Sequence, residues 1–457
     1  MAAAPVLRTD AAAAWRAAIA AVDPARLVAA LPDAWLQPPG GRVVVVGGGK
    51  AAAGMAAGVA RRLTGAGVAP DRLGGLVSVP EGCVVSVPGV EVRATRPAAA
   101  NLPTAAVVSA TEEILALVAA CAPDDLVVAV ITGGGSACLA APCDGVSLDD
   151  KVAVARYLAA AGADIAELNA VRRASSRVKA GGLARATRAG RLEALVLSDI
   201  LGDPLDLIAS GPCMPSPADP RLARDILDRR GAVAAGVAPG LVASLVARLA
   251  PDRAGAGPPA PATPRAAEWI TPAGCRVAHR IVGNNATAVA AAVAALEALG
   301  YDVAARGGAL PEEADVVGRR LAAEATALAR RAAALGRPLA IVEGGEATVR
   351  VPDDHGRGGR NQQTVLAAIA AASAAGGWPA GAALASIGTD GEDGPTDAAG
   401  AVADAAVARA AAADPARLRQ ALARRDALPI LEAAGGLVRT GPTGTNVADV
   451  RIVVARP

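Results

Sequence analysis

Two glycine loops are the parts of this sequence best suited to bind an anion. The first, Gly47 to Lys50 (GGGK), follows four valines, and the second, Thr132 to Ser136 (TGGGS), follows the apolar run 126–131. Short β-branched runs predict buried parallel strands. Glycines let the backbone turn sharply and expose its N–H groups, and a following helix adds the positive end of its dipole. Both loops therefore predict contacts with phosphate or carboxylate oxygens.

Lysine is rare in this chain, which makes the lysine of the first loop informative. The sequence has three lysines, Lys50, Lys151 and Lys179, and its other basic residues are arginines. A lysine supplies a compact point charge that an arginine does not. We therefore predict that Lys50 contacts a ligand, whereas Lys151, in a predicted helix, is expected to be solvated.

A basic, hydroxyl-bearing segment, residues 168–186, is a second candidate for anion binding. If it is helical, Arg172 and Ser176 share one face, as do Ser175 and Lys179. Such a face suits a carboxylate or a phosphate. An ordinary solvated charged face remains the alternative.

Aspartates follow predicted strands at two places. Asp199 ends the run ALVLS and Asp203 comes four residues later, while Asp390, Asp393 and Asp397 lie in one glycine-rich loop. Carboxylates at strand ends in α/β proteins suit Mg²⁺ or a general base. For Asp203, a turn-capping role before a proline remains open.

Strands and helices alternate along the whole chain, which predicts an α/β fold with more than one domain. The length of 457 residues allows two or three domains. A Pro/Gly/Ala-rich stretch at 251–264 is the best linker. We expect an N-terminal domain over 1–250, a linker over 251–270 and a C-terminal domain over 271–457.

Bulk composition excludes several functional classes. The net charge of +2 gives no electrostatic case for nucleic acid or an anionic membrane surface. The hydrophobic content of 53% is mostly alanine, and no stretch is predicted to span a membrane or act as a signal peptide. Six scattered cysteines without a CxxC fit a reduced cytoplasm, and the absence of phenylalanine excludes base-stacking platforms.

Taken together, the loops resemble a known family. GGGKAAAGMA, TGGGSACLAAP, LNAVRRASSRVKAGGLA, SDILGDPLDLIASGP, GGEATV, GRGGRNQQ, GTDGEDGPTDAAGA and TGPTGTNVADV resemble, in order, the motifs of MOFRL-type glycerate 2-kinases. This family has also been described as hydroxypyruvate reductases. The resemblance covers about residues 12 to 455, and its specificity lies in the combination of motifs.

The resemblance implies two α/β domains, the N-terminal one Rossmann-like with a mainly parallel sheet, and an active site in the interdomain cleft. It implies transfer of the γ-phosphoryl group of ATP, with Mg²⁺, to the 2-hydroxyl of D-glycerate. The catalytic lysine of the family falls on Lys50, and the arginine of its GGRNQ loop falls on Arg360. Small-molecule substrates are expected, and a homodimer is compatible with the sequence.

The candidate residues then take the following roles. Lys50, Arg360 and Asp199 are the catalytic candidates, with Asp199 as the base. Nucleotide contacts are expected from Gly133, Gly134, Gly135, Ser136, Asn284, Gly388, Asp390, Thr443 and Asn446. Substrate contacts are expected from Arg172, Lys179 and Ser210, and metal contacts from Asp199, Asp203 and Asp390.

The sequence departs from the family pattern at three places. Arg96 stands where a histidine usually precedes a proline, Ala174 stands at a second usual histidine, and Gln363 replaces a usual glutamate. A kinase acting on a related sugar acid therefore stays open. Attack by the 2- or the 3-hydroxyl also stays open from spacing alone.

Two other classes remain as alternatives. Gly47, Gly49 and Ala52 satisfy G-x-G-x-x-A, and Glu81 ends the next predicted strand, as an NAD(P)H-dependent hydroxypyruvate reductase would need. The lysine in the first loop, the second glycine loop and the aspartates are surplus to hydride transfer. A sugar-acid-binding regulator is the third alternative, although no basic recognition helix is found.

Overall fold

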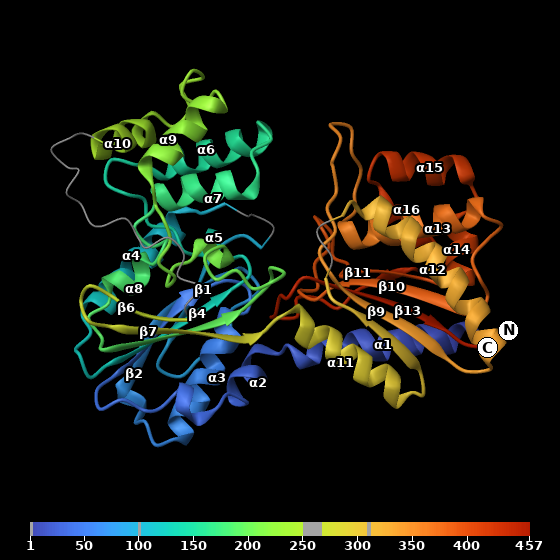
Figure 1. Cartoon of the computed structure of the whole chain (residues 1–457), viewed down its shortest axis with the longest axis horizontal. Helices are drawn as coiled ribbons and strands as arrows, with labels where there is room; N and C mark the ends of the chain where they lie inside the picture. Colours follow the sequence, from blue (N-terminus) through green and yellow to red (C-terminus); the bar gives the residue numbers. More distant parts are fainter. Residues whose placement is uncertain (1–2, 99–101, 250–266, 309–311) are drawn as a thin grey trace. The chain divides into compact units, whose positions relative to one another are not determined.

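The chain forms two compact α/β units, as the sequence predicts. The computed structural model describes residues 3–98, 102–249, 267–308 and 312–457 (Figure 1). The parallel-sheet unit comprises Pro24–Ser198 and Gly202–Val282, and the mixed-sheet unit comprises Met1–Asp23, Asp199–Leu201 and Gly283–Pro457.

These units differ from the predicted domain boundaries. The N-terminal helix α1 (Ala3–Ala21) belongs to the mixed-sheet unit, and residues 271–282 belong to the parallel-sheet unit, because β7 (Arg276–Gly283) extends its sheet. A change of composition marks a connection but not the sheet that the flanking segments join. Most of the predicted linker 251–270 lies outside the described residues.

The first sheet has seven strands in the order β3-β2-β1-β4-β5-β7-β6. The pairs from β3 to β5 are parallel, and β6 is antiparallel to β7. The strands are β1 (Val43–Gly48), β2 (Leu73–Pro80), β3 (Glu91–Arg96), β4 (Leu126–Thr132), β5 (Arg191–Leu197) and β6 (Glu268–Ile270). Because β1 and β4 are buried along their whole length, their apolar runs are continuous rather than alternating.

Helices cover this sheet and also form a separate group beside it. Figure 1 shows α3 (Ala52–Gly65) and α4 (Ala105–Ala119) on opposite faces, and α2 (Pro24–Ala29) packs on α3. The helical group is α6 (Leu148–Ala160), α7 (Ile165–Ala174), α9 (Pro220–Arg229) and α10 (Pro239–Leu249), with short α5 (Gly135–Cys138) and α8 (Gly182–Ala186) nearer the sheet. The group has its own apolar core, which includes Leu158, Ile226 and Leu241.

The second sheet has six strands in the order β12-β11-β10-β13-β9-β8. Only the β8–β9 pair is parallel among its described pairings. The strands are β8 (Asp302–Arg306), β9 (Leu339–Gly345), β10 (Ala382–Gly388), β11 (Gly400–Ala403), β12 (Leu437–Val438) and β13 (Asp449–Ala455). The last strand of the chain is thus a central strand of this sheet.

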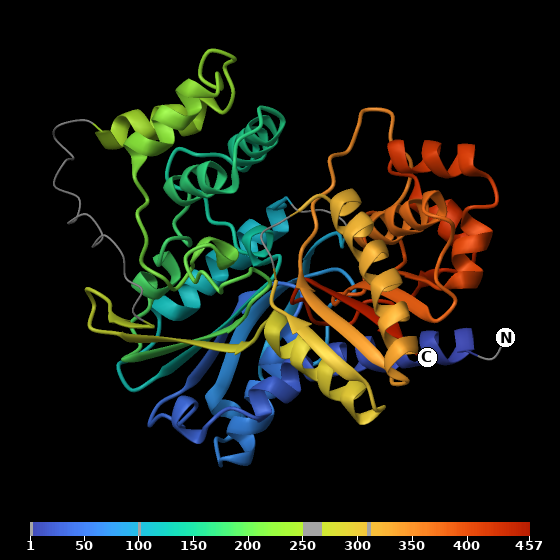
Figure 2. The ribbon, with the colours of Figure 1, turned by 45° about the vertical axis from the view of Figure 1, so that its right-hand side comes forward.

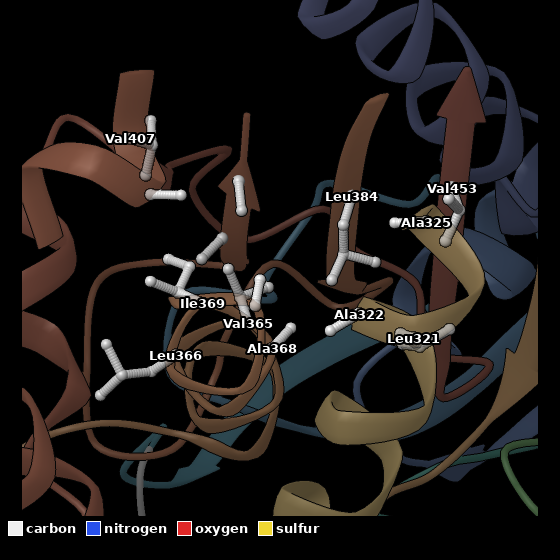
Figure 3. Close-up of a cluster of buried hydrophobic side chains, with 14 of the residues drawn as sticks. Leu321, Ala322, Ala325, Val365, Leu366, Ala368, Ile369, Leu384, Val407 and Val453 are labelled. Carbon is white, nitrogen blue, oxygen red and sulfur yellow. The ribbon is translucent and has the colours of Figure 1, made fainter. Parts of the chain in front are cut away.

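Helices pack on both faces of the second sheet. α1 and α11 (Asn285–Ala298) cover one face, and α12 (Ala314–Leu335) and α13 (Arg360–Ala374) cover the other (Figure 2). α14 (Ala405–Ala411), α15 (Pro415–Ala423) and α16 (Ala427–Ala433) complete the unit. Its core joins Leu321 of α12, Ile369 of α13, Leu384 of β10 and Val453 of β13 (Figure 3). Small aliphatic residues fill this core in a chain that lacks phenylalanine.

None of the described helices is both long and apolar enough to cross a membrane.

The close packing of β1 against β4 at Gly47 can be tested by substitution. Gly47 has φ of 145°, and a β-carbon there would overlap the carbonyl oxygen of Val130. We expect Gly47→Ala to lower the free energy of unfolding by at least about 2 kcal/mol, because it adds both strain and a steric clash. Gly74→Ala in β2 is the matched control, since nothing lies within 4 Å of its β-carbon position. Equal denaturation midpoints for the two variants would contradict this packing.

Candidate functional site

The two glycine loops lie side by side, as the sequence predicts. β1 and β4 are parallel neighbours, with Gly48 opposite Ile131 in the register. The loops that follow therefore leave the same edge of the sheet. Lys50 N donates a hydrogen bond of 3.0 Å to the carbonyl oxygen of Gly133, which ties one loop to the other.

The first loop does not expose its N–H groups, so that expectation is wrong. Gly49 N donates to Ser78 O at 3.1 Å, Lys50 N donates to Gly133, and Ala51 N donates to Thr132 Oγ1 at 3.2 Å. The reason is that β2 and β4 flank β1 and end at the same edge, where they supply acceptors. This loop fixes the position of Lys50 instead of cradling an anion.

The second loop does offer unoccupied N–H groups. Across the described parts of the chain, the backbone N–H groups of Gly133, Gly134, Gly135 and Ser136 have no hydrogen-bond partner. Gly134 is left-handed, with φ of 73° and ψ of −2°, and α5 begins at the next residue. Successive N–H groups in such a turn form a concave anion-binding surface.

Two basic side chains lie beside this second loop. A β-carbon on Gly134 would lie 3.9 Å from Lys50 Cγ and 3.2 Å from Arg96 Nη2. Arg96 is buried, and its Nη1 donates to the carbonyl oxygens of Pro97 and Ala98. The arginine at the first usual histidine position therefore adds a charge next to Gly134.

Lys179 fastens the second loop to the segment that carries Ser210. Its buried Nζ lies 2.7 Å from Ser136 Oγ, 3.1 Å from Ser136 O and 3.4 Å from Ala209 O. Ser210 Oγ contacts Ser136 Oγ at 3.3 Å and donates to Asn169 Oδ1 at 3.1 Å. Burial, and then the charges of Lys151 and Arg172, hold the pKa of Lys179 well below its usual value. The candidate residues Ser136, Lys179 and Ser210 are thus brought together.

The segment that contains Lys179 is not helical. The prediction that Ser175 and Lys179 share one face of a helix is therefore wrong. α7 ends at Ala174, and Ser175 is its C-cap. Beyond it, Ala180, Ala209 and Ser210 all have positive φ, between 50° and 61°. Such non-glycine conformations cost on the order of 1 kcal/mol or more each and concentrate at functional sites. The bond of 3.1 Å from Ala180 N to Ser210 O helps to hold this strained pair of segments.

Lys151 is buried, so the prediction that it is solvated is wrong. Its Nζ donates to Ser175 O at 3.1 Å and to Ser175 Oγ at 2.9 Å. Burial is the main cause that lowers its pKa to about 8, and the charge of Arg172 lowers it further. Arg172 itself is partly buried, and its pKa is also lowered by burial. Lys151, Arg172 and Lys179 therefore form a cluster of basic side chains in the parallel-sheet unit, with the two lysines buried and Arg172 partly buried.

In the mixed-sheet unit, Arg360 is held by two carboxylates. Its Nε and Nη2 donate to the two oxygens of buried Asp449 at 2.8 and 2.9 Å, and its Nη1 lies 2.8 Å from Glu346 Oε1. A bidentate pair fixes the plane of the guanidinium. Arg360 is the first residue of α13, and Asp449 is the first residue of β13.

Asp199 and Asp390 also belong to the mixed-sheet unit. Burial, and then the charges of Glu346 and Asp390, raise the pKa of Asp199 to about 6. Asn446 Nδ2 lies 3.5 Å from Asp199 Oδ2, and Thr443 N donates to Asp390 O at 3.2 Å. These four candidates are thus near one another.

Gly388 completes this group, because a β-carbon there would lie 3.1 Å from Asp390 Oδ1.

Other polar candidates have visible local roles. Asp393 accepts from the N–H groups of Asn361 and Gln362 at 2.9 and 2.8 Å, which anchors the start of α13. Asn284 caps α11 by accepting from Thr287 N at 3.2 Å. Asp397 is exposed and pairs with Arg439, so the three aspartates of that loop do not form one cluster.

Asp203 belongs to the parallel-sheet unit, where it has a positive φ of 51°, whereas Asp199 and Asp390 belong to the mixed-sheet unit. Across the described ranges, no group of three or more His, Cys, Asp or Glu residues could hold a metal ion by itself. Asp199 and Asp390 nevertheless offer carboxylate oxygens in one unit, and the charge of Asp390 contributes to the raised pKa of Asp199, which a bound cation would lower. This donor set fits an Mg²⁺ that is also held by nucleotide phosphates.

Sequence reasoning missed Asp449, Glu346 and Asn169. The first two had a usable signal, because each is a carboxylate next to a predicted apolar strand in a motif already noted, as Asp199 is. Asn169 gave no such signal, since its role depends on Ser210, which is distant in the sequence.

Comparisons with known proteins agree with these motifs. A family model named Domain of unknown function (DUF4147) matches residues 10–243, and the MOFRL family model matches residues 339–449. Human glycerate kinase is 33% identical over 90% of this chain and 84% of its own length. The chain belongs to the MOFRL glycerate kinase family.

Other members carry two kinds of name. The crystal structure of glycerate kinase from Thermotoga maritima matches 99% of this chain and 100% of its own, with a TM-score of 0.80 and 31% identity. A protein of Agrobacterium vitis named "Putative hydroxypyruvate reductase" is 38% identical over 96% of this chain and 92% of its own length. Membership of the MOFRL glycerate kinase family therefore does not by itself decide between the two reactions that these names describe. The residues of the candidate site must decide between them.

The pair of partly buried Arg360 and fully buried Asp449 yields a stability prediction. Asp449→Asn removes the charge that compensates the guanidinium, so we expect a loss of about 3 kcal/mol in the free energy of unfolding. Asp397→Asn is the matched control, because Asp397 is exposed and its pair with Arg439 contributes under about 1 kcal/mol. Thermal denaturation followed by circular dichroism compares the two. A similar small shift for both variants would contradict the predicted difference.

The buried amine of Lys151 yields a pH prediction. Its pKa of about 8 in the fold lies below the usual 10.5, so between these values the unfolded chain binds a proton that the folded chain does not. Stability relative to Lys151→Met should therefore rise as pH increases from 8 to 10.5, by roughly 3 kcal/mol in total. Parallel urea titrations across this range measure the difference. A difference that stays constant with pH would show that Lys151 keeps an ordinary pKa.

Proposed function

We propose that this protein is an ATP-dependent kinase that transfers the γ-phosphoryl group to the 2-hydroxyl of D-glycerate, giving 2-phospho-D-glycerate and ADP. The observation that carries the proposal is the loop Gly133–Ser136, whose four N–H groups have no partner in the described chain, with the side chain of Lys50 beside it. Phosphoryl transfer requires positioning and charge neutralisation more than covalent chemistry, and this loop supplies both.

The cationic residues have distinct proposed roles. Lys50 neutralises the transferring group, because its backbone is fixed at the loop while its side chain runs along Gly134. Arg360 stabilises the developing charge with a guanidinium that two carboxylates hold in one orientation. The carboxylate of glycerate binds at Arg172 and Ser210. Lys179 supports that site by holding the loop, since its N–H donors already serve Ser136 and Ala209.

The acidic residues of the mixed-sheet unit act as base and metal contacts in this proposal. Asp199, with a pKa of about 6, accepts the proton of the 2-hydroxyl near neutral pH. Asp199 and Asp390 hold Mg²⁺, which when bound neutralises phosphate charge. Asp203 would contribute a further oxygen.

The remaining nucleotide contacts are proposed at the helix and strand ends of the mixed-sheet unit. They are Asn284, Gly388, Thr443 and Asn446.

The N–H groups of the first loop disfavour the reductase. A dinucleotide fingerprint binds pyrophosphate through N–H groups of the glycine turn. Here the N–H groups of Gly49, Lys50 and Ala51 are all used within the protein. The G-x-G-x-x-A match therefore lacks the donors that a nicotinamide dinucleotide needs.

The identity of the acceptor acid is the part of the proposal that the three departures from the family pattern affect most. Arg96 lies next to Gly134. Ser175, which follows Ala174, accepts a hydrogen bond from Lys151. Gln363 contacts Asp315 at 2.7 Å and the carbonyl oxygen of Leu422, so it serves the packing of α13. We therefore test related sugar acids beside glycerate, with Arg96 and Ala174 as the positions to vary.

Two parallel assays decide between the reactions. One contains D-glycerate, ATP and Mg²⁺, and the other contains hydroxypyruvate and NADH. Glycerate-dependent release of ADP supports the kinase, whereas loss of NADH alone supports the reductase and overturns the proposal. Coupling the product to an enzyme specific for 2-phosphoglycerate identifies the hydroxyl that is attacked.

Substitutions test the two cations separately. We expect Lys50→Met and Arg360→Met each to lower kcat by about three orders of magnitude or more, because each removes charge from the transferring group. Arg439→Met is the matched control, since Arg439 is exposed and pairs with Asp397 and Glu432. Steady-state kinetics with glycerate measure the effect. Near-normal turnover of Lys50→Met would remove that residue from the mechanism.

A further inference from the structure

Ser136 of the second glycine loop and Lys179, which holds that loop, also form a serine–lysine pair. Ser136 is partly exposed, and its Oγ lies 2.7 Å from the buried Nζ of Lys179. A serine hydroxyl next to a lysine amine is one of the arrangements in which serine acts as a nucleophile. The lysine then serves as the general base.

The hydrogen bonds around this pair fit a neutral amine. The other two partners of Lys179 are the carbonyl oxygens of Ser136 and Ala209, which can only accept. In the neutral form of the amine, two N–H groups serve them, and its lone pair can accept the hydroxyl proton of Ser136 across the 2.7 Å contact. Burial and two neighbouring cations lower the pKa of Lys179, which favours the neutral form. Ser210 donates its own proton to Asn169, so the hydroxyl hydrogen of Ser136 has two acceptors within reach, Ser210 Oγ at 3.3 Å and the neutral amine of Lys179 at the shorter distance of 2.7 Å.

The same loop supplies donors for a developing oxyanion. The N–H groups of Gly133, Gly134, Gly135 and Ser136 have no partner within the described residues. Backbone N–H groups next to a nucleophile stabilise the tetrahedral intermediate of acyl transfer. Nucleophile, base and oxyanion donors are thus present within one short loop and Lys179.

We propose that Ser136 and Lys179 give this protein a second activity, the hydrolysis of small activated carboxylic esters. Ser136 Oγ attacks the ester carbonyl carbon while its proton passes to Lys179 Nζ. The alcohol leaves with that proton, and an acyl group stays on Ser136. Water then attacks the acyl group with the same lysine as base, which releases the acid and restores the serine. This activity is independent of the kinase reaction proposed above.

The chain contains an internal control for this chemistry. Lys151 Nζ and Ser175 Oγ form the same pair of groups at 2.9 Å. Ser175, however, is almost fully buried, and its backbone N–H bonds to the carbonyl oxygen of Val171. The proposal therefore predicts acylation at Ser136 and none at Ser175.

The test uses the full chain and p-nitrophenyl acetate. We expect release of p-nitrophenolate and, after acid quenching, an acetyl group on the peptide that contains Ser136. Ser136→Ala and Lys179→Met should each lower the acylation rate at least about tenfold, and Ser175→Ala should leave it unchanged. Circular dichroism checks that each variant is folded.

A pH profile of the wild-type rate keeps the proposal testable even if Lys179→Met does not fold. The rate should rise with pH and level off below the usual pKa of lysine, since the amine must lose its proton. Ester hydrolysis in Ser136→Ala at the wild-type rate would overturn the proposal. Acetylation confined to other residues would overturn it as well.

Discussion

The candidate site depends on the hydrogen bond from Lys50 N to the carbonyl oxygen of Gly133. Together with the bonds from Gly49 and Ala51, it commits the N–H groups of the first glycine loop to the strands on either side. Within the described residues, the second loop makes no such bonds and keeps its donors. The first loop therefore positions Lys50, and the second loop is the proposed anion-binding site. The close approach of Gly47 to Val130 makes this division possible, because no other residue type would let β1 and β4 lie this near.

The two units have opposite electrostatic characters at their candidate residues. The parallel-sheet unit gathers Lys151, Arg172 and Lys179, and burial lowers the pKa of all three, with a further lowering of both lysine pKa values by the charge of Arg172. In the mixed-sheet unit, burial raises the pKa of Asp199, and the charges of Glu346 and Asp390 raise it further. Each cluster stabilises the binding of the opposite charge, an anion in one unit and a cation in the other. A nucleotide phosphate with a divalent cation carries both.

Local patterns were enough to predict the strands and the positions of the glycine loops. Runs such as the valines of β1 are buried on both faces, so their pattern identifies a parallel sheet directly. The environment of Lys151 and the shape of the segment around Lys179 were not predictable, because both depend on contacts with residues far away in the sequence. Helix α7 ends before its C-cap Ser175, and Ala180 adopts a positive φ. An alanine in the sequence does not indicate such a conformation. The sequence also did not predict that helix α1 belongs to the mixed-sheet unit, because its packing depends on residues far away in the sequence.

The position of β13 has a consequence for the order in which the chain folds during synthesis. β13 is central in the second sheet, although it follows every other described strand of that sheet in the chain. Helix α1, which precedes all of these strands, contains Asp10, whose carboxylate accepts hydrogen bonds from Arg456 and Tyr301 at 3.0 and 2.6 Å. Its buried face must therefore wait for nearly the whole chain, while the parallel-sheet unit can already form. Closing so long a loop delays these contacts relative to the local pairings within the parallel-sheet unit.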